Sequence, residues 1–286
     1  MSSPTLSIQY SDSSSNELSL FPHDNPKAAV ILLLPALGVR ASFYKGFAQA
    51  LSDQGFHVVT ADWRGLGKSS IRPSRAIDFG YKELVEDLGE MVHAIKAHFQ
   101  ESKGFFLMGH SLGGQIESMF ISKQSEQIDG LILIASCMVY HTGWKEIGGS
   151  WRIKLICRLF PILAQIVGHF PGKTVGFGGR EARTVMRDWG YNGLTGSYAP
   201  KGDDFDYDGA LAQTTFPILA MSMQGDNFAP KAAVENLYKK YHSASPVSHL
   251  HISPEEADVP KLNHYNWAKH PAYFVRKVKE WVEKSR

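Results

Sequence analysis

The residues of greatest chemical interest surround a serine at the end of an apolar run. Residues 105–108 are apolar and lead directly into the pentapeptide Gly-His-Ser-Leu-Gly at residues 109–113. A serine at a sharp strand-to-helix corner needs strained backbone angles, and the residues two before and two after it must be small so that the flanking backbones can pass. Gly109 and Gly113 meet this requirement. The pattern predicts a nucleophile elbow that exposes the Ser111 hydroxyl, with an ordinary strand-to-helix turn as the alternative.

A serine hydroxyl is a weak nucleophile at neutral pH, so it needs a base within hydrogen-bond distance and a carboxylate that orients the base. On a scaffold with such an elbow these residues follow in the order serine, acid, histidine, each in a loop after a later strand. Residues 217–223 have the pattern of a buried strand, and Asp226 lies in the loop that follows. Asp226 is therefore the predicted orienting carboxylate, and capping of the helix near 231–242 is the alternative role.

The predicted base is His264, which follows the expected last strand and a polar loop. Two other histidines are less suitable as the base. His110 is next to Ser111, and because side chains alternate along a strand its side chain is expected to point to the opposite side. His270 directly precedes a proline, as is typical of a helix start. His249 and His251 share one face of the last strand, which is compatible with metal binding. No acidic or histidine partner follows them at a recognised metal spacing, so we expect no metal site.

The tetrahedral intermediate of such a reaction needs two backbone N–H donors. The N–H of Leu112, the residue after the serine, is the first expected donor. The second is expected in the loop after the apolar run 30–34, where Pro-Ala-Leu-Gly at residues 35–38 turns toward a helix. Leu37 is the candidate for this second position in the oxyanion hole.

The elements that must position these residues are predicted from the hydrophobic pattern. Apolar and polar residues alternate at 5–10 and 17–21 around a polar turn, which predicts an antiparallel hairpin. Later apolar runs alternate with helical segments, which predicts an α/β fold with a mostly parallel sheet and helices on both faces. The apolar runs lie at 29–34, 57–61, 105–108, 131–135 and 217–223, and the main helices are expected at 42–54, 82–99 and 271–284.

Between residues 137 and 214 the alternation of strands and helices stops, and apolar helix-like runs take its place. An insertion at this point would lie over the carboxyl ends of the strands, where ligands bind in open α/β sheets. We expect a core made of residues 1–136 and 215–286, with 137–214 as a helical lid or, alternatively, a packing decoration. The apolar stripe from Leu155 to Val167 is expected to line an acyl pocket.

Length and composition narrow the class of protein. The 286 residues suffice for one large domain, and a formal net charge of +2 without a basic stripe gives no indication of nucleic-acid binding. The longest apolar stretch, 28–39, is shorter than the roughly 20 residues that cross a bilayer, so no stable membrane insertion is expected. The amino terminus resembles no signal peptide, and Cys137 and Cys157 form no zinc or redox motif. We expect a cytoplasmic protein with reduced cysteines.

Two further motifs resemble ligand-binding loops without matching them fully. Residues 204–209 fit the opening of a calcium loop, yet its twelfth position is Thr215, where a bidentate glutamate is required. A solvated acidic loop is expected instead. The Gly-Lys-Thr at 172–174 is similar to the end of a phosphate-binding loop, but the upstream glycine, Gly168, lies one residue too close. We expect neither calcium nor nucleotide binding.

Taken in order, the hairpin, the donor loop, the elbow, the insertion, the acid loop and the histidine loop resemble the α/β-hydrolase superfamily over nearly the whole chain. Residues 62–69, Asp-Trp-Arg-Gly-Leu-Gly-Lys-Ser, also resemble the Asp-x-Arg-Gly-x-Gly-x-Ser loop of its lysophospholipase-like, esterase and proline-iminopeptidase-like branches. One departure falls in the donor loop, where many members carry His-Gly in place of Pro35-Ala36. A serine rather than an aspartate at the elbow argues against the epoxide hydrolase and haloalkane dehalogenase branches.

The resemblance implies acyl transfer to water without a metal or organic cofactor. Ser111 would attack a carbonyl carbon, His264 would take and return the proton, and Asp226 would fix the imidazole tautomer. The expected partner is a small-molecule acyl substrate, an ester or thioester with an apolar acyl part. Hydrolysis of a carbon–carbon bond or an aminoacyl amide is the runner-up, and a catalytically silent binding scaffold is an alternative of another class. The sequence does not indicate an oligomeric state.

Overall fold

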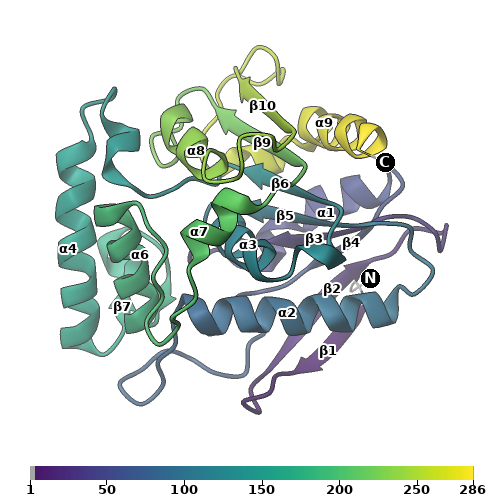
Figure 1. Ribbon diagram of the computed structural model, residues 1–286. Helices are drawn as coiled ribbons and strands as arrows, with labels where there is room; N and C mark the ends of the chain where they lie inside the picture. Colours follow the sequence, from purple (N-terminus) through teal and green to yellow (C-terminus); the bar gives the residue numbers. More distant parts are fainter. Residues whose placement is uncertain (1–3, 286) are drawn as a thin grey trace.

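The computed structural model describes residues 4–285; residues 1–3, part of the amino terminus from which a cytoplasmic location is predicted, lie outside the described residues. Within residues 4–285, eight strands form one sheet in the order β1-β2-β4-β3-β5-β6-β9-β10 (Figure 1). These strands are β1 (Thr5–Gln9), β2 (Ser15–Phe21), β3 (Val30–Leu34), β4 (His57–Thr60), β5 (Phe105–His110), β6 (Gly130–Ile134), β9 (Ile218–Met223) and β10 (Val247–Ile252). The predicted antiparallel hairpin is confirmed as β1 and β2, and from β4 to β10 neighbouring strands are parallel.

The register of the central strands brings the predicted site loops together. β3, β5, β6 and β9 are buried along their whole length, as expected for parallel strands covered on both faces. Leu34 at the end of β3 pairs with Gly109 of β5, and His110 pairs with Ile134 at the end of β6. The loop after β3 therefore starts beside the elbow that follows β5.

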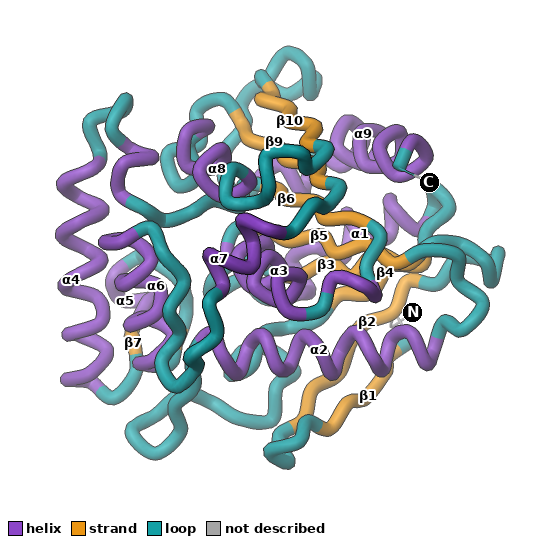
Figure 2. The backbone as a smooth tube through the Cα atoms, in the orientation of Figure 1, coloured by secondary structure: helices purple, strands orange, loops and turns teal. Residues whose placement is uncertain are grey.

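Helices cover both faces of the sheet (Figures 1 and 2). Helices α1 and α9 contact each other on one face, and α2, α3 and α7 pack in a row on the other. The predicted helix at 42–54 is divided into a 3-10 turn, η1, and the shorter helix α1. The bounds are η1 (Ala41–Tyr44), α1 (Lys45–Ser52), α2 (Tyr81–His98), α3 (Leu112–Lys123), η2 (Ser125–Gln127), α7 (Tyr207–Gln213), α8 (Lys231–Tyr238), η4 (Asn266–Lys269) and α9 (Pro271–Lys284).

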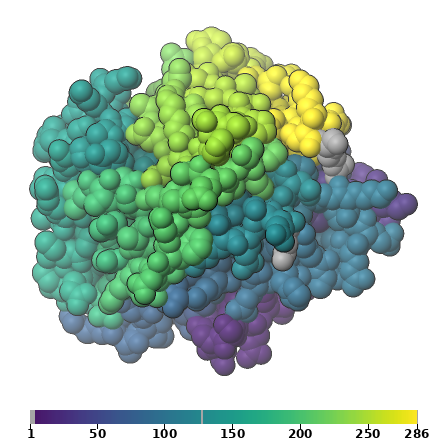
Figure 3. All heavy atoms as spheres, viewed as in Figure 1, coloured from purple at the N-terminus to yellow at the C-terminus, as the bar shows by residue number. Residues whose placement is uncertain are grey.

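Residues 137–214 form a largely helical segment at one side of the core, seen at the left of Figure 3. Helices α4 and α6 pack against each other, and a small antiparallel pair, β7 and β8, lies beside them. Helix α7, although in the same range of sequence, packs on α3 of the core. The additional elements are η3 (His141–Trp144), α4 (Ser150–Val167), β7 (Phe170–Pro171), α5 (Gly172–Val175), β8 (Arg180–Glu181) and α6 (Arg183–Thr195).

Helix α4 carries apolar side chains on two faces. Cys157 and Ala164 are buried, whereas the opposite face exposes large apolar side chains to solvent, with Trp151 61% exposed. The exposed large apolar residues of α4 are Trp151, Leu155, Leu159, Ile162, Ile166 and Val167. The prediction that the stripe from Leu155 to Val167 lines a pocket is therefore wrong for most of its members. Large apolar residues lie on both faces of the helix, so their spacing does not identify the inner face. No helix within residues 4–285 is long and apolar enough to span a bilayer.

Candidate active site

Ser111 lies at the corner between β5 and α3 with a strained backbone. Its φ of 54° and ψ of −113° lie in a region that a residue with a side chain rarely occupies. A Cβ on Gly109 would lie 2.1 Å from the backbone nitrogen of Gly114, and one on Gly113 would lie 2.5 Å from the carbonyl oxygen of Leu34. Both positions therefore require glycine for steric reasons, and the backbone has the geometry predicted for the elbow.

Asp226 and His264 are brought together from two loops that follow β9 and β10. Asp226 Oδ2 lies 2.9 Å from His264 Nδ1, and Oδ1 accepts hydrogen bonds from the backbone nitrogens of Phe228 (2.8 Å) and Ala229 (3.1 Å). Both side chains are buried. One oxygen of the carboxylate thus fixes its own loop and the other holds the imidazole. The alternative role as a helix cap is not observed, because the N-cap of α8 is Pro230 and no side chain caps it.

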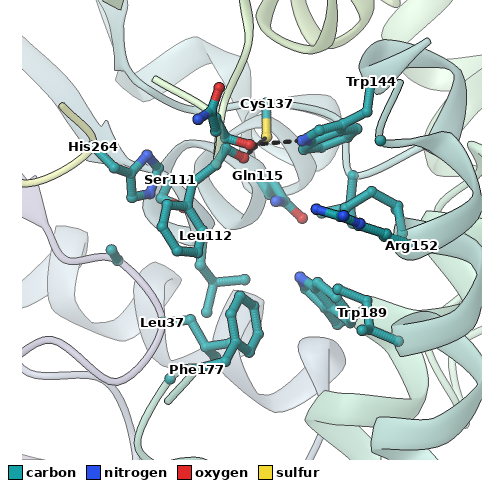
Figure 4. Close-up of a pocket in the computed structure, with 18 of the residues that line it drawn as sticks. Leu37, Ser111, Leu112, Gln115, Cys137, Trp144, Arg152, Phe177, Trp189 and His264 are labelled. Atoms are coloured by element: carbon teal, nitrogen blue, oxygen red, sulfur yellow. Dashed lines mark hydrogen bonds between the residues drawn. The ribbon is translucent and has the colours of Figure 1, made fainter. Parts of the chain in front are cut away.

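The imidazole of His264 is held on several sides and lies on the same cavity as Ser111. The imidazole ring contacts the ring of Phe228, with centroids 5.4 Å apart. The backbone carbonyl oxygen of His264 accepts a hydrogen bond from Trp267 Nε1 at 3.1 Å. Figure 4 shows the imidazole beside Ser111. Among the described residues, no hydrogen bond joins the Ser111 hydroxyl to the imidazole, so the structure brings the two to one cavity without a direct bond between them.

A buried pair of residues behind the site was not found by sequence reasoning. Tyr44 OH accepts a hydrogen bond from the backbone nitrogen of Ala36 (3.1 Å) and lies 2.6 Å from His110 Nδ1. Burial lowers the pKa of His110 well below its usual value, and its ring packs against that of His264 with centroids 4.8 Å apart. His110 is therefore a neutral packing partner of the predicted base. Nothing in the local sequence links Tyr44 with either residue, because the contact arises only from the packing of η1 on β5.

Within residues 4–285, neither of the two predicted N–H donors has a hydrogen-bond partner. Leu112 is the first residue of α3, and the first N–H groups of a helix have no partner within it. In the loop after β3, the N–H of Ala36 is occupied by Tyr44, whereas no hydrogen bond among the described residues uses the N–H of Leu37. The loop with Pro35-Ala36 in place of His-Gly thus still presents one unoccupied donor at the candidate position.

The loop at 62–69 supports the donor loop from behind. Trp63 Nε1 donates to the carbonyl oxygen of Pro35 at 2.8 Å, and Asp62 Oδ1 accepts from the backbone nitrogen of Ala41 at 2.8 Å. The Arg64 guanidinium contacts the buried carboxylate of Asp87, with Nε 2.8 Å from Oδ2. This motif therefore fixes both ends of the segment that carries Leu37.

A cavity of about 330 Å³ adjoins Ser111 and has mostly apolar walls. Its volume suits a small organic molecule. One cation, Arg152, lines it, and no carboxylate does so among the described residues. The lining residues, drawn in part in Figure 4, are Ala36, Leu37, Ser111, Leu112, Gln115, Cys137, Val139, Trp144, Ile147, Gly149, Arg152, Ile153, Ile156, Phe177, Gly178, Trp189, Asn227, Phe228, His264 and Tyr265.

The other motifs of the sequence lie away from this cavity. His249 and His251 approach the Ser222 hydroxyl at 3.0 and 2.8 Å, and His270 precedes the first turn of α9 as its N-cap. Asp206, in the calcium-like stretch, caps α7 by accepting from the backbone nitrogen of Gly209. These residues have local structural partners. Cys137 and Cys157 are both free and buried.

Comparison with known proteins identifies the family. The family model of the serine aminopeptidases, S33, matches residues 24–176, more than half of the chain. A pimeloyl-[acyl-carrier protein] methyl ester esterase of Aeromonas salmonicida (strain A449) is 26% identical over 267 residues, which cover 88% of this chain and 94% of that protein.

Similar folds occur in solved structures. A thermophilic esterase from Thermogutta terrifontis superimposes with a TM-score of 0.63 at 16% identity, covering 99% of both chains. A monoacylglycerol lipase of Paleococcus ferrophilus also gives 0.63 at 16% identity, covering 94% of this chain and 98% of the lipase. The protein therefore belongs to the serine aminopeptidase S33 family and is a hydrolase with the α/β-hydrolase fold.

Proposed function

We propose that the protein hydrolyses a carboxylic ester or thioester with an apolar acyl part, using Ser111 as nucleophile, His264 as base and Asp226 as the orienting acid. The observation that carries the proposal is the buried Asp226–His264 pair on the same apolar cavity as the strained serine. Acyl transfer needs these three functions in this arrangement.

The reaction would proceed in two halves. His264 Nε2 accepts the proton of Ser111 as the hydroxyl oxygen attacks the substrate carbonyl, and the resulting imidazolium is stabilised by Asp226 Oδ2 at Nδ1. The backbone N–H groups of Leu112 and Leu37 are the proposed donors to the oxyanion. His264 then protonates the leaving alcohol or thiol, and in the second half it activates the water that releases the acid.

The walls of the cavity favour an ester or thioester over an aminoacyl amide. The ammonium group of an aminopeptidase substrate needs a carboxylate partner when it is desolvated, and no Asp or Glu among the described residues lines the cavity. The relative from Aeromonas salmonicida is named a methyl ester esterase, which supports an ester as the bond that is cleaved. No observation favours carbon–carbon bond cleavage.

Residues 137–214 are proposed to act as a lid, because Trp144, Ile147, Ile153 and Ile156 of this segment form part of the cavity wall. A wall contributed by a separate segment would exclude water from the acyl group during the reaction. The cytoplasmic location stays a prediction, which the two free cysteines support.

Labelling with a fluorophosphonate probe, followed by hydrolysis of p-nitrophenyl esters of increasing chain length, tests the proposal. We expect the wild-type protein and Ser122→Ala to be labelled and active, and Ser111→Ala to be neither. Ser122 is the matched control, because it lies on α3 and its hydroxyl only donates to a backbone carbonyl in the same helix. Undiminished labelling of Ser111→Ala, or unlabelled wild-type protein, would refute the assignment.

A further inference from the structure

Three polar side chains meet in the part of the cavity that lies away from His264. Figure 4 shows the polar ends of Gln115, Arg152 and Trp189 facing one another across this region. They come from three different helices, α3, α4 and α6. The surrounding walls are apolar, so these groups are the feature that would orient a substrate there.

These side chains offer hydrogen-bond donors that the protein itself does not use. Gln115 Oε1 accepts from Tyr81 OH at 3.4 Å, which leaves its amide NH₂ available. No hydrogen bond among the described residues involves Trp189 Nε1 or the Arg152 guanidinium. Arg152 forms no ion pair with a described carboxylate, and its guanidinium lies 5.3 Å from the centre of the Trp151 ring.

A group of unused donors around one cation, without a neighbouring carboxylate, is complementary to an anion. The planar fork of an arginine matches a carboxylate in two parallel hydrogen bonds, and Trp and Gln donors can occupy its remaining lone pairs. The apolar walls between this region and Ser111 suit a hydrocarbon chain. A ligand that fits both the anion-binding donors and the apolar walls has an ester at one end, a hydrocarbon chain in the middle and a free carboxylate at the other end.

We propose that Gln115, Arg152 and Trp189 form a carboxylate-binding subsite, so that the preferred substrates are monoesters of straight-chain dicarboxylic acids. The inference rests on the proposed esterase function and specifies its substrate class. Gln115 follows Ser111 by one turn of α3, roughly 6 Å along the helix axis. The carboxylate of the substrate must therefore be separated from the reacting carbonyl by several methylene groups.

The test compares monomethyl esters of the dicarboxylic acids from succinic to suberic with methyl esters of the monocarboxylic acids of matching length. Arg152 is exposed to solvent, which screens its charge, so we expect a preference for the monoesters of about tenfold in kcat/KM. Arg152→Gln should abolish this preference by raising the KM for the monoesters. Lys154→Gln, the same loss of charge at a residue of α4 that does not line the cavity, should leave the preference intact.

Binding measured with a catalytically inactive variant tests the carboxylate subsite independently of the hydrolysis reaction. Ser111→Ala should bind the monoester of the optimal length in a calorimetric titration, and the double variant Ser111→Ala/Arg152→Gln should bind it at least about tenfold more weakly. Equal kcat/KM for charged and neutral esters, or a preference that survives Arg152→Gln, would overturn the subsite while leaving the esterase intact. Absence of ester turnover together with unlabelled Ser111 would instead refute the proposed function, and monoester binding that depends on Arg152 would then still support the subsite.

Discussion

Replacement of Asp226 by asparagine tests the proposed chemistry with little change in shape. Asp226 Oδ1 accepts two backbone hydrogen bonds, from Phe228 and Ala229. In Asp226→Asn only the amide oxygen can accept both, so the NH₂ group must face His264 Nδ1. An NH₂ donor at Nδ1 selects the tautomer with its proton on Nε2, which then has no lone pair for the serine proton.

The expected loss follows from this change of tautomer. A carboxylate-to-amide change that leaves the site geometry intact and inverts the tautomer lowers kcat by about 10⁴-fold in a serine hydrolase, or about 5 kcal/mol in the activation barrier. The fold should survive, because both backbone hydrogen bonds to Oδ1 are kept. We expect the free energy of unfolding to fall by no more than about 1–2 kcal/mol.

Steady-state hydrolysis of a p-nitrophenyl ester and urea unfolding together measure the two effects. Asp206→Asn is the matched control, because the Asp206 carboxylate also accepts a backbone N–H, here from the first turn of α7, but has no histidine partner among the described residues. It should leave kcat unchanged. Retention of more than about a tenth of the wild-type kcat by folded Asp226→Asn would show that the imidazole does not depend on this carboxylate, contrary to the proposed roles.

Three further changes test the supports of the site. Gly113→Ala places a methyl group 2.5 Å from the carbonyl oxygen of Leu34 at the end of β3. The donor loop must then shift, so kcat should fall at least about 10²-fold. Gly46→Ala is the control, because a methyl group there meets open space, and it should leave kcat unchanged. Burial holds the pKa of Glu117 well above 4.5, so above that pH the carboxyl ionises in the unfolded chain before it does in the folded protein, and the free energy of unfolding falls as pH rises. Glu117→Gln should remove this fall, about 1.4 kcal/mol per pH unit, from urea unfolding measured at increasing pH above 4.5. Parallel wild-type and variant curves would contradict this. Asp87→Asn removes the buried carboxylate partner of Arg64, which keeps an ion pair with Asp12, so the free energy of unfolding should fall by about 1–3 kcal/mol. An unchanged thermal midpoint would exclude a stabilising role for the Arg64–Asp87 pair.

Much of the fold could be predicted because its signals are local. The apolar runs that became β3, β5, β6 and β9 are short and bounded, and the alternation of strands and helices restricts the topology to a few arrangements. The strain at Ser111 was predictable from its two glycines, since a close approach of backbones excludes a Cβ at both positions. The pairing of Asp226 with His264 followed from the order of the loops.

The remaining features depend on contacts between distant segments, which no local pattern records. The contact of Tyr44 with His110 depends on how η1 packs on the sheet, and the meeting of Gln115, Arg152 and Trp189 depends on how α4 and α6 lie over α3. The inward face of α4 was not predictable for a related reason. A helix with large apolar side chains on two faces does not show which of them is buried, so its packing on α6 decides which side is exposed.

The exposed face of α4 has an optical consequence. Trp151 is 61% exposed, whereas Trp63, Trp144, Trp189, Trp267 and Trp281 are each 8% exposed or less. A quencher dissolved in water will therefore reach one indole in preference to the other five. The neighbouring Arg152 guanidinium should make iodide a more effective quencher of this indole than caesium. Intrinsic fluorescence thus gives a label-free signal from the outer surface of α4 while substrate occupies the cavity on its other side.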